Sequence, residues 1–373
     1  MLQKIFHTGD LHLGMAYGNR GYPEGVRKEL VEARFKTLAG LVERANEEKC
    51  GLFLVAGDLF HRTNVPRQTV LWALEILAGF EGNCVAVLPG NHDYGDEYSS
   101  LWKTFRETAP DNVLLLDRTA PYDLREFNLE VTLFPAPCHS KHSGENRLGW
   151  IREMETLPGA GVQLGVAHGS VKGISPDFDG RYFPMEGREL TELGLHHWCL
   201  GHTHVPYPDR ELTRDTPFTY CGTPEADGFD CGHSGFARIT LLDEQGNLES
   251  RCVVTGRFNF GELSKEINGL DDLLELEREL AGRGENTLLK LVLSGTLPRD
   301  EYDARWGIIE RIRESLTYLE LDESSLCMEI TTETIAEEFA RESFPFLLLS
   351  RLAQKGETEA LQAAYQMIKK VSK

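Results

Sequence analysis

The chain has 373 residues, of which 41% are hydrophobic and 26% charged, a composition that excludes a disordered polymer and predicts two or three folded domains. Its formal net charge of −20 excludes a surface that is basic throughout, as in proteins that coat nucleic acid. A nuclease stays open, because bound divalent cations and a local basic rim can supply the positive field that the net charge lacks.

Short apolar runs alternate with helical patterns through the first half of the chain. In chain order, we predict a strand at 3–7, a helix at 27–48, a strand at 52–56, a helix at 66–79, a strand at 84–88 and a helix at 97–108. Further strands are predicted near 113–116, 130–134, 162–167 and 197–200, and a β-rich stretch at 217–255. This alternation predicts a layered α/β domain over residues 1–260.

A second pattern begins after a boundary near 258–270. Helix, strand, helix and strand are predicted in turn, at 270–280, 287–293, 303–315 and 326–331. This order suggests a small α/β accessory domain at 261–333. Residues 334–373 read as a helical tail, broken near 343–345 and at 356. Its apolar residues, among them Phe344 and Leu347, either pack on the same chain or dock a partner.

Polar side chains of one kind follow the predicted strands. Aspartate, asparagine and histidine stand at the carboxyl ends of five of them, as Asp10, His12, Asp58, His61, Asn91, His92, Asp93, His168, His202 and His204. In α/β sheets, ligands collect where these strand ends meet. Oxygen donors mixed with imidazole suit divalent metals such as Mn, Fe or Zn. Each residue alone also has an ordinary structural role, but their joint occurrence at strand ends predicts a metal site.

The series D-x-H, G-D, G-N-H-D, a lone H and G-H-x-H resembles the calcineurin-like metallophosphoesterases, and it spans about residues 7–204. The resemblance implies a layered β-sandwich flanked by helices, with two divalent metal ions. It assigns one metal to Asp10, His12, Asp58 and His204, and the other to Asp58, Asn91, His168 and His202. Two cations about 3.5–4 Å apart need a shared carboxylate, here Asp58, to screen their repulsion. Together they lower the pKa of bound water. His92 is then the general acid, and Asp93 orients or caps its loop.

Within that superfamily, GDLHLG and GDLFH look like the DNA double-strand-break-repair exonucleases, the SbcD-type nuclease subunits. The segment YCGTPE at 220–225 is similar to a motif of that family, and the accessory domain matches its capping domain. The resemblance implies a Mn²⁺-dependent DNA exonuclease or endonuclease, with Fe, Zn or Mg as alternative metals. It also implies an SMC-like ATPase of the SbcC type as partner, and a homodimer formed by the helices at 66–79 and 97–108. Packing of these helices onto the sheet is the alternative.

The histidine at 61 distinguishes this chain from relatives with aspartate there. We expect His61 either to orient His92 or to contact the scissile phosphate. Arg20, Arg62 and Arg67 lie in loops beside the motifs and are candidate contacts to DNA phosphates. A phosphatase or phosphodiesterase acting on small phosphoesters is the alternative function.

The sequence also bears on where the protein works. No apolar run approaches the roughly 20 residues of a membrane span, and the N-terminus reads as a buried strand rather than a signal peptide. The eight scattered cysteines form no C-x-x-C pair, so we expect reduced packing residues. A cytoplasmic protein without membrane contact is predicted.

Overall fold

The structure is a computed structural model that describes residues 2–95, 99–159, 161–209 and 216–371. The chain divides into two compact units, Met1–Phe260 and Gly261–Lys373. Among the described residues, no helix is both long and apolar enough to cross a membrane.

The first unit contains a six-stranded sheet in the order β11-β10-β1-β2-β3-β4. Its strands are β1 (Gln3–Thr8), β2 (Leu52–Ala56), β3 (Cys84–Leu88), β4 (Val113–Leu115), β10 (Phe236–Leu242) and β11 (Leu248–Val254). The four strands from β1 to β4 are parallel, and β10 and β11 continue the sheet antiparallel. Every residue of β2 and β3 is buried, as their unbroken apolar runs predict for central parallel strands.

A five-stranded sheet in the order β5-β6-β7-β8-β9 forms the other layer. Its strands are β5 (Tyr122–Asp123), β6 (Val131–Ala136), β7 (Val162–His168), β8 (His197–Gly201) and β9 (Phe218–Tyr220). β6 to β9 run parallel, with β5 antiparallel at the edge. One buried cluster combines β1, β2 and β3 residues with β6, β7 and β8 residues, for example Leu54 with Leu164. The two sheets therefore pack face to face.

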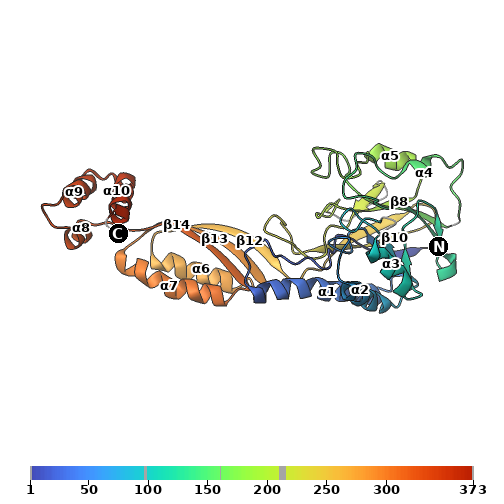
Figure 1. Cartoon of the computed structure of the whole chain (residues 1–373), viewed down its shortest axis with the longest axis horizontal. Helices are drawn as coiled ribbons and strands as arrows, with labels where there is room; N and C mark the ends of the chain where they lie inside the picture. Colours follow the sequence, from blue (N-terminus) through green and yellow to red (C-terminus); the bar gives the residue numbers. More distant parts are fainter. Residues whose placement is uncertain (1, 96–98, 160, 210–215, 372–373) are drawn as a thin grey trace. The chain divides into compact units, whose positions relative to one another are not determined.

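Helices cover the outer faces of this sandwich (Figure 1). α1 (Glu24–Glu47), α2 (Arg67–Ala78) and α3 (Ser100–Thr108) bury apolar residues against the first sheet. α4 (Gly149–Arg152) and α5 (Gly187–Glu192) do so against the second, and the short helix η1 (Leu124–Phe127) follows β5. The layered sandwich flanked by helices is thus confirmed. The predicted helix at 97–108 is described from Ser100; its residues 97 and 98 lie outside the described part of the chain.

The second unit contains a three-stranded sheet, β12-β13-β14, with two helices packed on one face (Figure 1). The elements are β12 (Asn259–Ile267), α6 (Leu270–Ala281), β13 (Thr287–Leu297), α7 (Arg299–Glu314) and β14 (Tyr318–Met328). The strand predicted at 326–331 was placed too late in the chain. β14 begins at Tyr318 and pairs with β13 from there. Its first residues alternate between exposed polar and more buried side chains, so the sequence shows no apolar run at that point.

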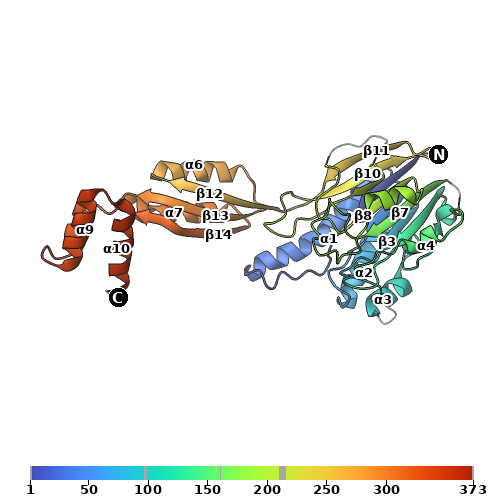
Figure 2. The ribbon, with the colours of Figure 1, turned by 90° about the horizontal axis from the view of Figure 1, so that it is seen from above.

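The tail forms α8 (Thr332–Glu338), α9 (Phe344–Lys355) and α10 (Thr358–Val371). Both predicted breaks are confirmed: the Ser343 side chain caps α9 by accepting a hydrogen bond from the Phe346 N–H, and Gly356 ends α9 in the left-handed region. The three helices share a small apolar cluster that includes Leu349 and Tyr365. α9 and α10 lie side by side (Figure 2).

Candidate metal centre

The predicted site residues gather at one edge of the sandwich. The first sheet contributes the residues after β1, β2 and β3, and the second sheet contributes the end of β7 and the loop after β8. Both sets stand at the carboxyl ends of parallel strands, so parallel pairing brings them together. The buried core between the sheets fixes the two halves of the site against each other.

The loops that carry these residues have unusual backbone conformations. Asp10, His12, Asp58 and His202 all have positive φ, at 53°, 49°, 53° and 101°. Gly57 has φ +93°, and a Cβ added there would lie 2.1 Å from the Nδ1 atom of His168. Only glycine permits this close approach of backbone and imidazole, so the residue before Asp58 is essential to the geometry.

The first group of donors consists of Asp10, His12 and His204, whose donor atoms lie within 4.8 Å of one another. The Nε2 atoms of His12 and His204 are 3.3 Å apart. The Nε2 atom of His204 lies 3.8 Å from Oδ1 of Asp10. Two imidazole nitrogens facing each other beside a carboxylate are arranged for a cation between them.

The second group consists of Asp58, Asn91, His168 and His202. The Nε2 atom of His168 lies 3.3 Å from Oδ2 of Asp58 and 2.9 Å from Oδ1 of Asn91. Nδ1 of His202 approaches the same Asn91 oxygen at 3.2 Å. The other ring nitrogen of His168, Nδ1, donates to the main-chain oxygen of Ala56 at 2.8 Å. Nε2 of His168 is therefore the nitrogen that faces the centre.

Asp58 lies between the two groups. Its Oδ2 atom is 3.3 Å from Nε2 of His168 and 3.8 Å from Nε2 of His12. Its other oxygen, Oδ1, accepts a hydrogen bond from the main-chain N–H of His92 at 2.8 Å. A carboxylate in this position can contact both donor groups at once.

The electrostatics of the centre favour bound cations. Asp10 and Asp58 are both buried. Burial raises the pKa of Asp10, and the negative charge of Asp58 adds to that. For Asp58, the neighbouring His168 and His12 outweigh burial and hold the pKa well below its usual range. Burial lowers the pKa of His202 to about 3. Against the effect of burial, Asp58 raises the pKa of His168 to about 9, so the buried carboxylates favour positive charge beside them. The donors fit divalent cations, which would supply that charge.

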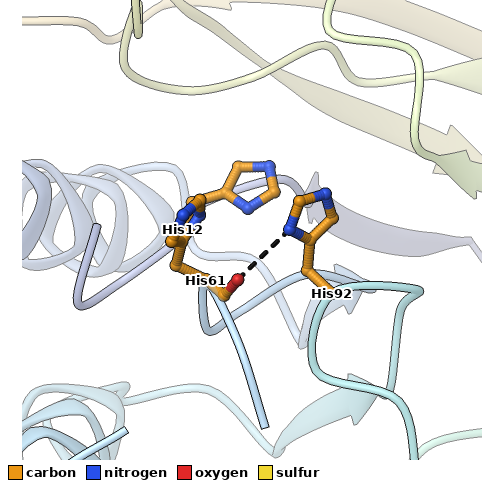
Figure 3. A group of neighbouring side chains, drawn as sticks. All are labelled: His12, His61 and His92. Carbon is orange, nitrogen blue, oxygen red and sulfur yellow. Dashed lines mark hydrogen bonds between the residues drawn. The ribbon is translucent and has the colours of Figure 1, made fainter. Parts of the chain in front are cut away.

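A second cluster consists of His12, His61 and His92 (Figure 3). The ring centroids of His12 and His92 are 4.8 Å apart, and those of His61 and His92 are 5.5 Å apart. Nδ1 of His92 lies 3.2 Å from the main-chain oxygen of His61, the contact drawn as a dashed line. Burial and the positive charges of His92 and Arg62 lower the pKa of His61 to about 4.

Asp93 has a structural task in this loop. Its Oδ2 atom accepts a hydrogen bond from the Phe60 N–H at 2.9 Å, and Oδ1 accepts one from the Gly90 N–H at 2.7 Å. Burial raises its pKa to about 8, with a further contribution from Asp58. Because both oxygens bind main chain, the geometry fits the expected orienting role and does not support a direct part in the chemistry.

The three candidate arginines are exposed. Arg20 lies against the loop after β9, where its Nη1 atom would be 2.1 Å from a Cβ added at Gly228. Arg62 directly follows His61, and Arg67 is the first residue of α2. All three stay candidates for contacts to phosphate.

Several residues of the site were not predicted. The Asp227 carboxylate lies 3.5 Å from Nδ1 of His204. Arg34, buried inside α1, donates to the main-chain oxygen of Leu11 at 2.7 Å and so holds the loop after β1. The Tyr182 ring packs against His202, with centroids 4.8 Å apart. In sequence Arg34 is one of many helical arginines, so no local signal distinguishes it.

The Calcineurin-like phosphoesterase family model matches residues 3–206, more than half of the chain. The chain therefore belongs to the calcineurin-like phosphoesterase family and is a metallophosphoesterase by fold and site. Its described site residues lie within the matched region apart from those of the loop after β9.

Individual relatives are distant. The chain is 24% identical to the uncharacterized metallophosphoesterase YhaO of Bacillus subtilis over 86% of this chain and 78% of that protein. It is 25% identical to the DNA double-strand break repair protein Mre11 of Methanopyrus kandleri over 70% of this chain and 55% of that protein. For Mre11 of Aeropyrum pernix the identity is 24%, over 59% and 53%. The chain thus spans about half the length of both archaeal proteins.

Two solved structures are similar over about two thirds of this chain. One is TT1561 of Thermus thermophilus, with a TM-score of 0.40, 12% identity, and coverage of 67% of this chain and 99% of that chain. The other is a dimetal phosphatase from Danio rerio, with a TM-score of 0.37, 11% identity, and coverage of 68% and 99%.

Proposed function

We propose that this protein is a two-metal-dependent DNA exonuclease or endonuclease, the nuclease subunit of an SbcCD-like DNA repair complex. The observation that carries the proposal is the position of Asp58, whose Oδ2 atom lies 3.8 Å from Nε2 of His12 in one donor group and 3.3 Å from Nε2 of His168 in the other. DNA as the substrate is supported by the similarity to the two archaeal double-strand break repair proteins.

Each donor group would hold one divalent cation. Asp10, His12, Asp58 and His204 would hold the first, and Asp58, Asn91, His168 and His202 the second. When bound, the two cations neutralise charge on the phosphate and lower the pKa of water that attacks phosphorus. Mn²⁺ is our first choice, and Fe, Zn or Mg also suit a set of nitrogen and oxygen donors without sulfur.

His92 is placed to act as the general acid. Its main-chain N–H is fixed by Asp58, and its Nδ1 atom is fixed by the main-chain oxygen of His61. These two contacts leave Nε2 as the atom that gives a proton to the leaving oxygen of the nucleic acid strand. Asp93 holds the loop that carries His92, and the His61 ring contacts the phosphate or steadies His92.

The proposal extends to partners. Arg20, Arg62 and Arg67 would contact DNA phosphates. An SMC-like ATPase of the SbcC type would dock on the helical tail, where Phe344 and Leu347 are 73% and 58% exposed. The β12–β14 domain would act as the capping domain, the protein would work as a homodimer, and it would be cytoplasmic. The apolar faces of α2 and α3 pack onto the first sheet, so a dimer seam there would use their exposed residues, such as Trp72.

A phosphatase or phosphodiesterase acting on small phosphoesters is the second candidate. The net charge of −20 favours it, because DNA-binding surfaces are normally basic. Hydrolysis of a small ester requires the metal centre alone, whereas a DNA strand also requires a surface that binds its phosphates on either side of the centre.

One experiment separates the two candidates. Purified protein is incubated with Mn²⁺ and either end-labelled duplex DNA, end-labelled single-stranded DNA or bis-p-nitrophenyl phosphate. His92→Ala and a chelator serve as controls. Shortening of the DNA that both controls abolish is the expected result. Turnover of the small ester with intact DNA would overturn the nuclease proposal and leave the phosphoesterase.

A further inference from the structure

His204 is the donor whose two ring nitrogens face different groups. Its Nε2 atom faces the first donor group, 3.3 Å from Nε2 of His12 and 3.8 Å from Oδ1 of Asp10. Its Nδ1 atom faces away from them, 3.5 Å from Oδ2 of Asp227. The Asp227 side chain is 13% exposed, so this carboxylate is largely shielded from water. The electrostatic interaction of this carboxylate with the imidazole is therefore only weakly screened by water.

The segment that carries Asp227 also holds the main chain of this donor group. The ring of His233 donates from Nε2 to the main-chain oxygen of His204 at 2.8 Å. The main-chain N–H of Thr223 donates to the same oxygen at 2.9 Å. The Thr223 hydroxyl donates to the main-chain oxygen of Asp10 at 2.9 Å. Residues 223–233 thus support both Asp10 and His204.

His168 and Asn91 of the second donor group are supported in another way. Behind His168 lies the main-chain oxygen of Ala56, 2.8 Å from Nδ1. Behind Asn91 lies the main-chain oxygen of Lys141, 3.4 Å from Nδ2. A neutral carbonyl and a carboxylate both orient an imidazole, but the carboxylate also raises the basicity of the nitrogen that faces a cation.

We infer that Asp227 is a positioning residue that sets the affinity of the metal position formed by Asp10, His12 and His204, without controlling the other position. This inference rests on the proposed two-metal centre. A carboxylate beside Nδ1 of His204 favours the orientation and tautomer in which Nε2 is the nitrogen that binds a cation. Loss of such a partner typically weakens metal binding about 10- to 100-fold. The metal affinities of the two positions should therefore differ more when the charge of Asp227 is removed.

The test is a calorimetric titration of metal-free protein with Mn²⁺, without any substrate. Asp227→Asn retains the shape of the side chain and removes its charge, and Asp227→Ala removes both. Asp230→Asn, on an exposed residue of the same loop, is the matched control. The wild type and the control should bind two ions. Both Asp227 variants should bind one ion with unchanged affinity and the other about 10- to 100-fold more weakly.

The outcomes distinguish the inference from the proposed function. Unchanged binding of both ions by both Asp227 variants would overturn the inference, and so would equal weakening of both ions. If the wild type itself binds no Mn²⁺, the two-metal proposal fails. The melting temperature of each metal-free variant must match that of the wild type. Weaker binding of an ion can then be attributed to the metal site and not to a destabilised fold. His233→Ala, which removes a second support of His204, should weaken the same ion by a smaller factor.

Discussion

The imidazole of His92 is held by the main-chain oxygen of His61, 3.2 Å from Nδ1, and not by the His61 ring. A carbonyl oxygen can only accept a hydrogen bond, so Nδ1 of His92 carries the proton. Any side chain at position 61 would provide the same oxygen. The effect of the His61 ring can therefore be measured apart from the orientation of His92.

His61→Ala should lower kcat for a phosphodiester about 10- to 100-fold, while the bound metal content stays at the wild-type value. The Nδ1 atom of His61 is buried and has no hydrogen-bond partner in the described structure. This fits a ring nitrogen whose partner is a group of the bound substrate. Steady-state kinetics and metal analysis check this. Wild-type kcat in His61→Ala would show that position 61 contributes only its main-chain oxygen.

His92→Ala should lower the rate of DNA cleavage about 10²- to 10⁴-fold, the usual range for loss of a general acid. The loss should be much smaller for bis-p-nitrophenyl phosphate, because a nitrophenolate leaves without needing a proton. Parallel measurement of kcat on both substrates gives the comparison. An equal loss on both would contradict the proton-donor role and point to a disturbed metal centre.

Gly57→Ala should abolish metal binding and activity. A methyl group there would lie 2.1 Å from Nδ1 of His168, so the imidazole or the backbone must move. Gly173→Ala is the matched control, because Gly173 also has positive φ, at +83°, but meets nothing within 4 Å. It should cost about 1 kcal/mol of stability and retain full metal binding. Calorimetric metal titration and thermal melts of both variants test the contrast; similar metal binding by the two would be against it.

The stability of the first unit should fall in mild acid. Burial lowers the pKa of His197 to about 4 and that of His7 to about 3, and Arg238 adds to both shifts. Neutral His197 bonds to Thr219 and the main chain. Between its pKa of about 4 in the fold and the usual value near 6.5, the unfolded chain binds more protons than the folded one. The free energy of unfolding therefore decreases as the pH falls through this window, by up to about 3 kcal/mol for His197.

Denaturant unfolding at several pH values in the presence of a chelator measures this slope without interference from metal. His197→Gln, which cannot take up the proton, should show a shallower dependence on pH in the same window. If the slopes of wild type and variant agree, His197 does not govern the acid response.

Much of the first sheet was predictable, because its central strands are uniform apolar runs. β2 and β3 are wholly buried and appear in the sequence as unbroken hydrophobic segments. The ends of α9 were predictable from Ser343 and Gly356, whose chemistry is local. β14 was misplaced because its polar, half-exposed residues alternate without an apolar run, and its pairing with β13 comes from tertiary structure.

The candidate site was predictable to the extent that its residues follow strands. The donors from Asp10 to His204 stand where parallel strands end, so order along the chain predicts proximity in space. Asp227 and Arg34 have no such marker. Asp227 reaches His204 through an irregular loop after β9, and Arg34 reaches Leu11 from a helix. Side chains that support a site from outside its motifs depend on three-dimensional packing, which a single sequence does not encode locally.

The centre joins the two layers of the sandwich, since Asp58 follows β2 of the first sheet and His168 ends β7 of the second, with 3.3 Å between their donor atoms. A cation held by both would act as a cross-link between the sheets, in addition to their apolar core and to the hydrogen bond from His168 to Ala56. The free energy of unfolding would then depend on the free metal concentration. A free metal concentration about 100 times the dissociation constant adds about 2.7 kcal/mol to the free energy of unfolding. Chelation should therefore lower the melting temperature of the first unit.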